Sequence, residues 1–165
     1  MVKPDAHTVL LVDDDPNDAL LIERAFRKLG HDILLQHLDD GEKVAAYLSG
    51  KGDYADRSRY RIPRLILLDL KLPRKSGHEI LEWLRGQAEF RRLPVVVLTS
   101  SREAADVTRA YELGANSYLV KPVEFNALLD SFSPRSLCHS VKTELDSKAR
   151  QYELTSQLGA KFVQE

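Results

Sequence analysis

Short apolar runs alternate with segments of helical periodicity along most of the chain. Runs of four to eight apolar residues are typical of strands, whereas an amphipathic helix repeats its apolar residues every three or four positions. By these criteria we expect strands at about 8–12, 33–38, 65–68, 95–98 and 117–120. We expect helices at about 16–29, 42–48, 77–85 and 102–113, and a further one that begins near 123.

Turn and cap residues support several of these boundaries. The pair Asp15-Pro16 is typical of a helix start, because Asp caps the first N–H groups and Pro is tolerated at the first helical position. Gly30 and Gly114 stand where the neighbouring helical patterns end. Pro94 comes directly before the expected fourth strand. These residues indicate a regular alternation of strand and helix.

Such an alternation predicts an α/β fold with a parallel sheet covered by helices on both faces. Right-handed crossovers leave few ways to wind five strands into one sheet. We expect a doubly wound five-stranded parallel sheet with the strand order 2-1-3-4-5. This order places the first and third strands side by side, so residues that follow them share one crevice.

Length and charge exclude several classes of protein. The chain has 165 residues, 43% of them hydrophobic, which is enough for one domain with a buried core. The formal net charge of −1 gives no field that would attract nucleic acid or an acidic membrane surface. Neither a secretory signal nor a run of membrane-spanning length is present, and the single Cys138 fits a reducing compartment. We therefore expect a cytoplasmic protein with no nucleic-acid or membrane partner.

Two segments depart from the compact pattern. Residues 49–64 form a long connection rich in Arg, for which we weigh a solvated insertion against a basic docking edge for an acidic partner. Ser133-Pro134 should end the last helix early, so we divide the chain into a domain at 1–133 and a polar tail at 134–165. For this tail we expect a weakly ordered helix, with a dimer-forming or partner-binding helix as the alternative.

Acidic residues directly follow two of the expected strands. Asp13 and Asp14 come after the first strand, and Asp69 comes after the third. Carboxylates that lie close together raise one another's pKa unless a cation is present. Mg²⁺ prefers oxygen ligands, usually one or two carboxylates with waters and phosphate oxygens. The sequence therefore predicts a magnesium site formed by these three side chains.

The same edge of the sheet offers the groups that phosphoryl transfer needs. A carboxylate such as Asp69 can attack a phosphoryl group and form an acyl phosphate. Lys121 follows the fifth strand and could place a positive charge on the phosphoryl oxygens, and Thr99 at the end of the fourth strand could donate its hydroxyl. Taken alone, Thr99 and Lys121 would be ordinary turn residues. Their positions at successive strand ends favour the functional interpretation.

Five motifs in this order resemble the receiver domain of two-component response regulators, which has a flavodoxin-like fold. The resemblance covers about residues 8–132. Its motifs are Asp13-Asp14, the run Leu68-Asp69-Leu70-Lys71-Leu72-Pro73, Gly77, Leu98-Thr99-Ser100, and the run Tyr118-Leu119-Val120-Lys121-Pro122.

The resemblance implies roles for the acidic residues. Asp69 would accept a phosphoryl group from a phosphohistidine on a sensor histidine kinase. Asp14 and Asp69 would bind Mg²⁺ directly, together with the backbone carbonyl of Lys71, while Asp13 would act through a water molecule. The chain would not be an enzyme in the usual sense, but a phosphoacceptor that assists its own magnesium-dependent phosphotransfer and dephosphorylation.

The resemblance also implies how the signal would leave the site. Lys121 would contact the phosphoryl oxygens, and the peptide bond between Lys121 and Pro122 would be cis. Thr99 and Tyr118 resemble the switch pair of the family: phosphorylation would draw the Thr99 hydroxyl inward and let Tyr118 rotate inward. Tyr118 could also be simply a half-buried aromatic residue with its hydroxyl in water.

The long connection before the third strand and Leu72-Pro73 after it are similar to a narrower group, the single-domain receivers that serve phytochrome-type sensor kinases. A homodimer is an alternative assembly, although the early end of the fifth helix at Pro134 argues against a dimer interface that includes this helix. In a single-domain receiver, the signal would be passed on through protein contacts or through transfer of the phosphoryl group to another protein.

Two alternatives remain open at this point. A phosphatase of the haloacid dehalogenase type also uses an Asp nucleophile and Mg²⁺, but Asn17 stands where that family places a small or hydroxyl residue. A pseudo-receiver would bind partners without being phosphorylated, but it would normally lack one of the four residues Asp13, Asp14, Asp69 and Lys121. The five histidines have no metal-ligand spacing and are expected at the surface, and Trp83 is expected to be a packing residue.

Overall fold

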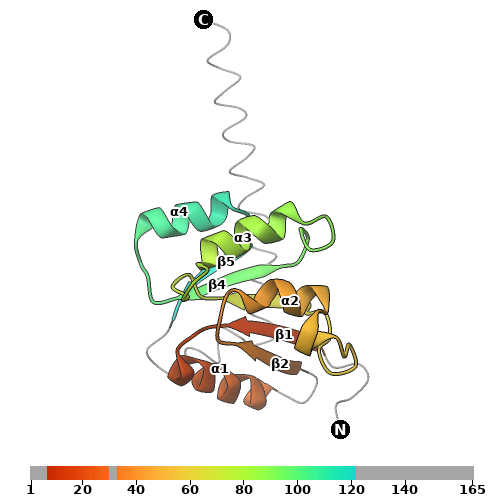
Figure 1. The fold of residues 1–165 in the computed structure, drawn as a ribbon. Helices are drawn as coiled ribbons and strands as arrows, with labels where there is room; N and C mark the ends of the chain where they lie inside the picture. The colour runs from red at the N-terminus through yellow and green to blue at the C-terminus, as the bar shows by residue number, and fades with distance from the viewer. Residues whose placement is uncertain (1–6, 30–32, 122–165) are drawn as a thin grey trace, which may run out of the picture.

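The computed structural model describes residues 7–29 and 33–121 of the chain. Strands and helices alternate along this part (Figure 1). The strands are β1 (His7–Val12), β2 (Ile33–Leu38), β3 (Leu65–Leu68), β4 (Val95–Thr99) and β5 (Ser117–Val120). The helices are α1 (Pro16–Leu29), α2 (Lys43–Ser49), the 3₁₀ turn η1 (Gly52–Tyr54), α3 (Gly77–Gly86) and α4 (Ala104–Glu112).

All five strands form one parallel sheet in the order β2-β1-β3-β4-β5, which confirms the predicted fold class and strand order. Residues of β1 alternate between two buried clusters. Val9 and Leu11 pack with α1, whereas Leu10 and Val12 pack with α2 and α3. This period of two is the property of a strand that is covered on both faces. The helix expected near residue 123 lies outside the described residues.

Most element boundaries agree with the sequence prediction to within two residues. The largest difference is at α4, which begins at Ala104 rather than at 102. Ser101 accounts for this shift, because its hydroxyl oxygen accepts the backbone N–H of Glu103 and its hydroxyl hydrogen is donated to Asp106. At α3 the start is fixed by a capping box between Ser76 and Glu79.

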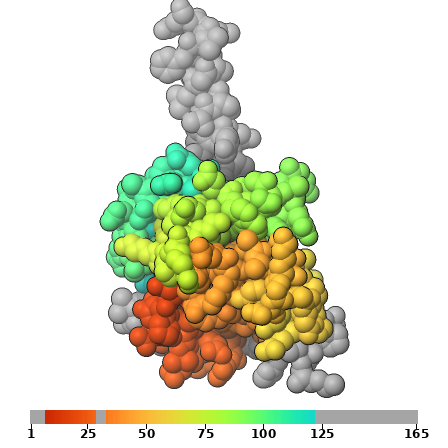
Figure 2. Space-filling view, in the orientation of Figure 1, coloured from red at the N-terminus to blue at the C-terminus, as the bar shows by residue number. Residues whose placement is uncertain are grey.

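The connection from α2 to β3 is largely exposed, as expected for a solvated insertion, but several of its side chains are anchored to the fold. Tyr47, Tyr54 and Tyr60 pack against one another in tilted and edge-to-face arrangements, with ring centroids 5.1–6.1 Å apart. Arg57 donates to the carbonyl oxygens of Tyr47, Leu48 and Tyr60, so its guanidinium caps the end of α2. In Figure 2 the yellow atoms of the connection form a continuous surface with the orange atoms of α2. Tyr54, Arg57 and Tyr60 therefore anchor this exposed segment to α2.

The structure also tests the predicted exposure of the histidines and the predicted packing of Trp83. His78 is only 9% exposed and its Nε2 lies 3.4 Å from the carbonyl oxygen of Asp106, so the expectation of a surface histidine is wrong for this residue. His7 and His37 are exposed, as expected. Trp83 packs against Phe90 at a centroid distance of 6.0 Å, in agreement with a packing role. Among the described residues, no helix has the length and hydropathy that a membrane span requires.

Candidate functional site

Three strands deliver charged side chains to one edge of the sheet. Asp13 follows β1 and donates its backbone N–H to Leu38 of β2, while Asp69 follows β3 and donates to Val12 of β1. Lys121 follows β5, and its N–H is bonded to the carbonyl oxygen of Thr99 at the end of β4. These ladder bonds hold the Cα atoms of the charged residues in fixed positions. The sheet topology therefore brings together residues that lie far apart in the sequence.

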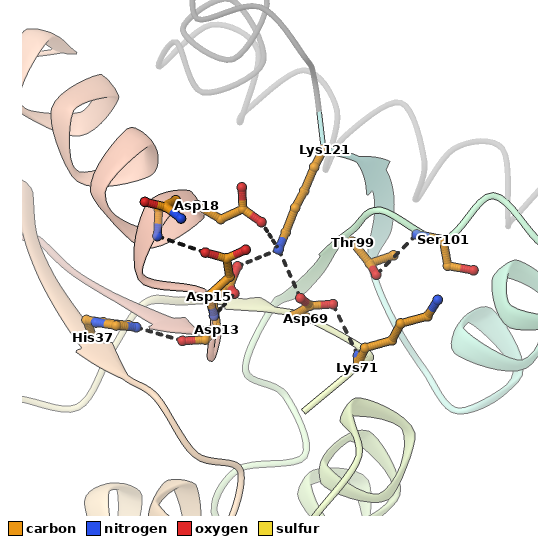
Figure 3. A network of polar contacts seen from close by, with 10 residues as sticks. Asp13, Asp15, Asp18, His37, Asp69, Lys71, Thr99, Ser101 and Lys121 are labelled. Carbon is orange, nitrogen blue, oxygen red and sulfur yellow. Dashed lines mark hydrogen bonds and ion pairs between the residues drawn. The ribbon is translucent and has the colours of Figure 1, made fainter. Parts of the chain in front are cut away.

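The ammonium group of Lys121 lies at the centre of this site (Figure 3). Its Nζ is 2.7 Å from Asp13 Oδ2, 2.9 Å from Asp69 Oδ2 and 2.8 Å from Asp18 Oδ2. Asp13 and Asp69 are nearly fully buried, whereas the Asp18 side chain is 34% exposed. The sequence predicted that Lys121 and the acidic strand ends share one edge of the sheet, but it predicted neither their ion pairs nor the contribution of Asp18.

Backbone N–H groups orient the two buried carboxylates. Asp13 Oδ1 accepts the N–H of Asp15 at 3.0 Å, and Asp69 Oδ1 accepts the N–H of Lys71 at 3.1 Å. Each of these side chains therefore turns one oxygen toward its own loop and the other toward Lys121. The predicted role of Asp15 as a helix cap agrees with the structure, because its Oδ1 accepts the N–H of Asn17 at 2.8 Å.

Burial and ion pairing act against each other in this site. Burial raises the pKa of Asp13 above its usual value, although hydrogen bonding to Lys121 partly offsets this effect. Burial disfavours the charged form of Lys121, but the contacts with the three carboxylates outweigh this effect and raise the pKa of the ammonium. Lys121 is therefore positively charged at neutral pH, next to more negative charge than it can balance.

Asp13, Asp14 and Asp69 could hold a metal ion. Each offers a carboxylate oxygen, and these oxygens lie within 4.8 Å of one another. Asp14 is exposed, so its carboxylate faces the solvent side of the cluster, from which an ion and its waters would enter. Hard oxygen donors with excess negative charge suit a cation such as Mg²⁺ or Mn²⁺. The three residues predicted from the strand ends do come together.

Thr99 and Tyr118 lie next to the site on β4 and β5. Thr99 is fully buried, and its Oγ1 accepts the N–H of Ser101 at 3.4 Å. The Tyr118 hydroxyl donates to the carbonyl oxygen of Ser101 at 2.7 Å, so the alternative in which this hydroxyl is merely solvated does not describe the structure. Ser101 thus connects both predicted switch residues through its backbone. The predicted cis bond before Pro122 lies outside the described residues.

Two residues of the site were missed at the sequence level. Asp18 lies in the first turn of α1, where a helix that follows a strand end carries its side chains back over the same edge. His37 lies near the end of β2, and its Nε2 is 2.8 Å from the carbonyl oxygen of Asp13. Their positions next to a strand end were the available signal. That signal identifies a site residue only when the direction of its side chain is known, and the sequence pattern does not provide this direction.

Comparison with known proteins places this geometry in a family. The family model described as "Response regulator receiver domain" matches residues 9–133. The chain is 42% identical over 127 residues to the "Probable methanogenesis regulatory protein FilR2" of Methanothrix harundinacea, covering 75% of this chain and 77% of that protein. It is 39% identical over 115 residues to "Response regulator Rcp1" of Synechocystis sp., covering 68% of this chain and 75% of that protein.

Solved structures with the same fold agree with this assignment. The phosphorylated cyanobacterial phytochrome response regulator RcpA has a TM-score of 0.70 and 34% identity, over 76% of this chain and 87% of that chain. The Mn²⁺-bound form of response regulator Rcp1 has a TM-score of 0.68 and 36% identity, over 76% of this chain and 93% of that chain. Sequence, fold and site geometry therefore agree that the chain belongs to the response regulator receiver domain family of two-component signalling.

Proposed function

We propose that this receiver accepts a phosphoryl group on Asp69 from a phosphohistidine of a sensor histidine kinase. One observation carries the proposal: Asp69 Oδ2 lies 2.9 Å from the ammonium of Lys121, beside two further carboxylates at the open edge of the sheet. In the transfer, a carboxylate oxygen of Asp69 forms a bond to phosphorus while the bond from phosphorus to the histidine nitrogen breaks. The electron pair of that bond stays on the nitrogen, and because the other ring nitrogen of the phosphohistidine carries a proton, the imidazole leaves neutral.

The acidic residues would hold Mg²⁺. Asp14 and Asp69 would be direct ligands together with the carbonyl oxygen of Lys71, and Asp13 would act through a water molecule. The fit to a hard divalent cation is supported by three carboxylate oxygens within 4.8 Å of one another. When bound, Mg²⁺ supplies positive charge where negative charge accumulates on the phosphoryl oxygens. The Mn²⁺-bound structure of Rcp1 supports a divalent ion in a relative.

Lys121 and Thr99 would recognise the phosphoryl group. The ammonium, which pairs with Asp69 in the structure, would move its contact to a phosphoryl oxygen. The buried hydroxyl of Thr99 would give up its contact with Ser101 and donate to the same group. Because Tyr118 is bonded to Ser101 as well, this movement would change the surface formed by β5 and the start of α4.

The partner would be a kinase of the phytochrome type. Solved relatives titled as phytochrome and bacteriophytochrome response regulators support this choice, at 34% and 41% identity. We place the receiver at residues 1–133 and the tail at 134–165, which fits the family match to residues 9–133. A docking role for the basic side chains Lys51, Arg59 and Arg64, which are exposed, stays a prediction.

The two alternative functions have less support. The match of the chain to the receiver family leaves no observation in favour of a phosphatase of the haloacid dehalogenase type. A pseudo-receiver is disfavoured because Asp13, Asp14, Asp69 and Lys121 are all present and assembled in one site.

The test is the mass of the intact protein after incubation with acetyl phosphate, with and without Mg²⁺. We expect the wild type to gain one phosphoryl group only in the presence of Mg²⁺, and Asp69→Asn to gain none. Asp15→Asn is a matched control, because it removes a nearby carboxylate that caps α1. If the wild type gains no phosphoryl group in the presence of Mg²⁺, the pseudo-receiver becomes the better account.

A further inference from the structure

Lys121 has one partner that the proposed function does not use. Its ammonium has three hydrogens, and three carboxylate oxygens lie within 2.9 Å of Nζ. Two of these belong to Asp13 and Asp69, whose carboxylates would also serve the metal and the phosphoryl group. The third belongs to Asp18, which stands in the first turn of α1 and comes from a different element.

Three carboxylate oxygens surround the ammonium, so a phosphoryl oxygen can contact it only where one of them gives way. The contact with Asp69 would be given up when that carboxylate becomes an acyl phosphate. The new phosphoryl group carries about two negative charges and needs a charge-assisted donor. Asp18 keeps its own negative charge throughout, so it continues to attract the same ammonium. It also adds to the negative charge that an incoming phosphoryl group meets.

We propose that Asp18 is a positioning residue that holds Lys121 on the α1 side of the site and competes with phosphoryl oxygens for its ammonium. The inference rests on the proposed function of Asp69. By this account Asp18 weakens the hold on a phosphoryl group and thereby sets how strongly the phosphorylated state is retained. Asp18→Asn keeps an oxygen acceptor of nearly the same shape but removes the charge, so it isolates the competition.

A simpler role for Asp18 must be separated from this one. An acidic residue in the first turn of a helix stabilises the helix through the dipole. Such a role would change the thermal midpoint of unfolding, but not the affinity of the site for a phosphoryl group. Asp15→Asn removes the same charge from the same end of α1, where Asp15 binds the N–H of Asn17, and is therefore the control. Asp18→Glu restores the charge on a longer side chain.

The first experiment measures the affinity of the folded protein for beryllofluoride, a mimic of the phosphoryl group, by titration calorimetry in excess Mg²⁺. Because ion pairs with a partly exposed partner are modest in strength, we expect Asp18→Asn to bind beryllofluoride about three- to tenfold more tightly than the wild type. Asp18→Glu should lie near the wild type, and Asp15→Asn should change the affinity by less than about twofold. Unchanged or weaker binding by Asp18→Asn would overturn the proposal, as would an equal gain in Asp15→Asn.

The second experiment does not depend on phosphorylation. A short pulse of acetic anhydride is applied to the metal-free protein, and acetylation of Lys121 is measured by peptide mass. We expect more labelling in Asp18→Asn than in the wild type or Asp15→Asn, because the amine loses the 2.8 Å contact that holds it against α1. Equal acetylation of Lys121 in Asp18→Asn and in the wild type would contradict the proposal that Asp18 holds Lys121. If labelling rises but the wild type binds no beryllofluoride, the proposed function fails while the hold on Lys121 stands.

Discussion

The change Lys121→Met removes the only positive charge among the described residues that contacts Asp13, Asp18 and Asp69 together. Methionine is close to lysine in length, so the change removes the ammonium and leaves the packing of the side chain largely intact. Asp13, which is 1% exposed, then stays buried beside Asp69 without a cation. We expect the metal-free variant to be less stable than the wild type at neutral pH.

The size of this effect follows from burial. Removing one partner of a fully buried ion pair costs about 3–5 kcal/mol, because an uncompensated charge is left behind. Lys121 is 12% exposed and Asp18 is 34% exposed, so water screens part of the remaining charge. A loss of about 2–3 kcal/mol is therefore reasonable at pH 7. With a urea m-value of about 2 kcal/mol/M, the unfolding midpoint should fall by roughly 1–1.5 M.

The dependence on pH has a definite sign. The pKa of Lys121 is raised above its usual value of 10.5, so its stabilising effect is fully present at pH 7 and would be lost only as the pH rises through the raised pKa. In the variant the pKa of Asp13 should rise further, because its cation is gone and burial remains. Asp13 should then take up a proton as the pH falls from 7 towards 4. The difference in stability between variant and wild type should shrink over that range.

Urea unfolding of both proteins, followed by circular dichroism at pH 7 and pH 5 with and without Mg²⁺, provides the assay. Mg²⁺ should stabilise the variant more than the wild type, because Lys121 no longer competes for the carboxylates. The reasoning is refuted if the metal-free variant at pH 7 is as stable as the wild type. It is also refuted if the loss is the same at both pH values and unaffected by Mg²⁺.

Three further predictions concern the surroundings of the site. Arg57→Ala should lower the free energy of unfolding by about 2–3 kcal/mol in denaturant titrations, because three carbonyl oxygens lose a charged donor. Arg64→Ala, at an exposed side chain, is the control and should change this free energy by less than about 0.5 kcal/mol. Gly77→Ala should weaken Mg²⁺ binding in calorimetry and destabilise the fold, because the new Cβ would lie 2.4 Å from the backbone carbonyl oxygen of Asp69. Gly86→Ala is the control and should change neither property, because no atom lies within 4 Å of its Cβ. Mg²⁺ affinity should fall as the pH is lowered from 7 towards 4, because the raised pKa of Asp13 lets protons compete for the carboxylate; a constant affinity over this range would contradict the account.

The strand ends explain why much of the site could be predicted. Asp13, Asp69 and Lys121 each follow a short apolar run, and the parallel topology alone decides that these ends meet at one edge. Thr99 could be predicted in the same way, since it ends β4. Tyr118 lies within β5 and was identified only through its resemblance to the switch pair of the receiver family.

The residues that were missed depend on geometry that the pattern does not encode. Asp18 reaches Lys121 because of the phase of α1 relative to the sheet, and its own position is typical of an ordinary helix start. Tyr54 and Tyr60 follow no helical or strand period, so their packing against Tyr47 of α2 could not be inferred from the sequence. His78 is a further case, because a polar residue on a helix is buried or exposed according to the neighbour that packs against it.

The central claim is that Asp69 becomes an acyl phosphate. The most direct measurement treats the acetyl phosphate-labelled protein with borohydride, which reduces the acyl phosphate to a primary alcohol and releases inorganic phosphate, and then locates the alcohol by peptide sequencing in a mass spectrometer. The account predicts homoserine at position 69, only after labelling in the presence of Mg²⁺. Homoserine at position 13 or 14 instead, or an unmodified Asp69 in a protein that had gained the phosphoryl mass, would contradict it.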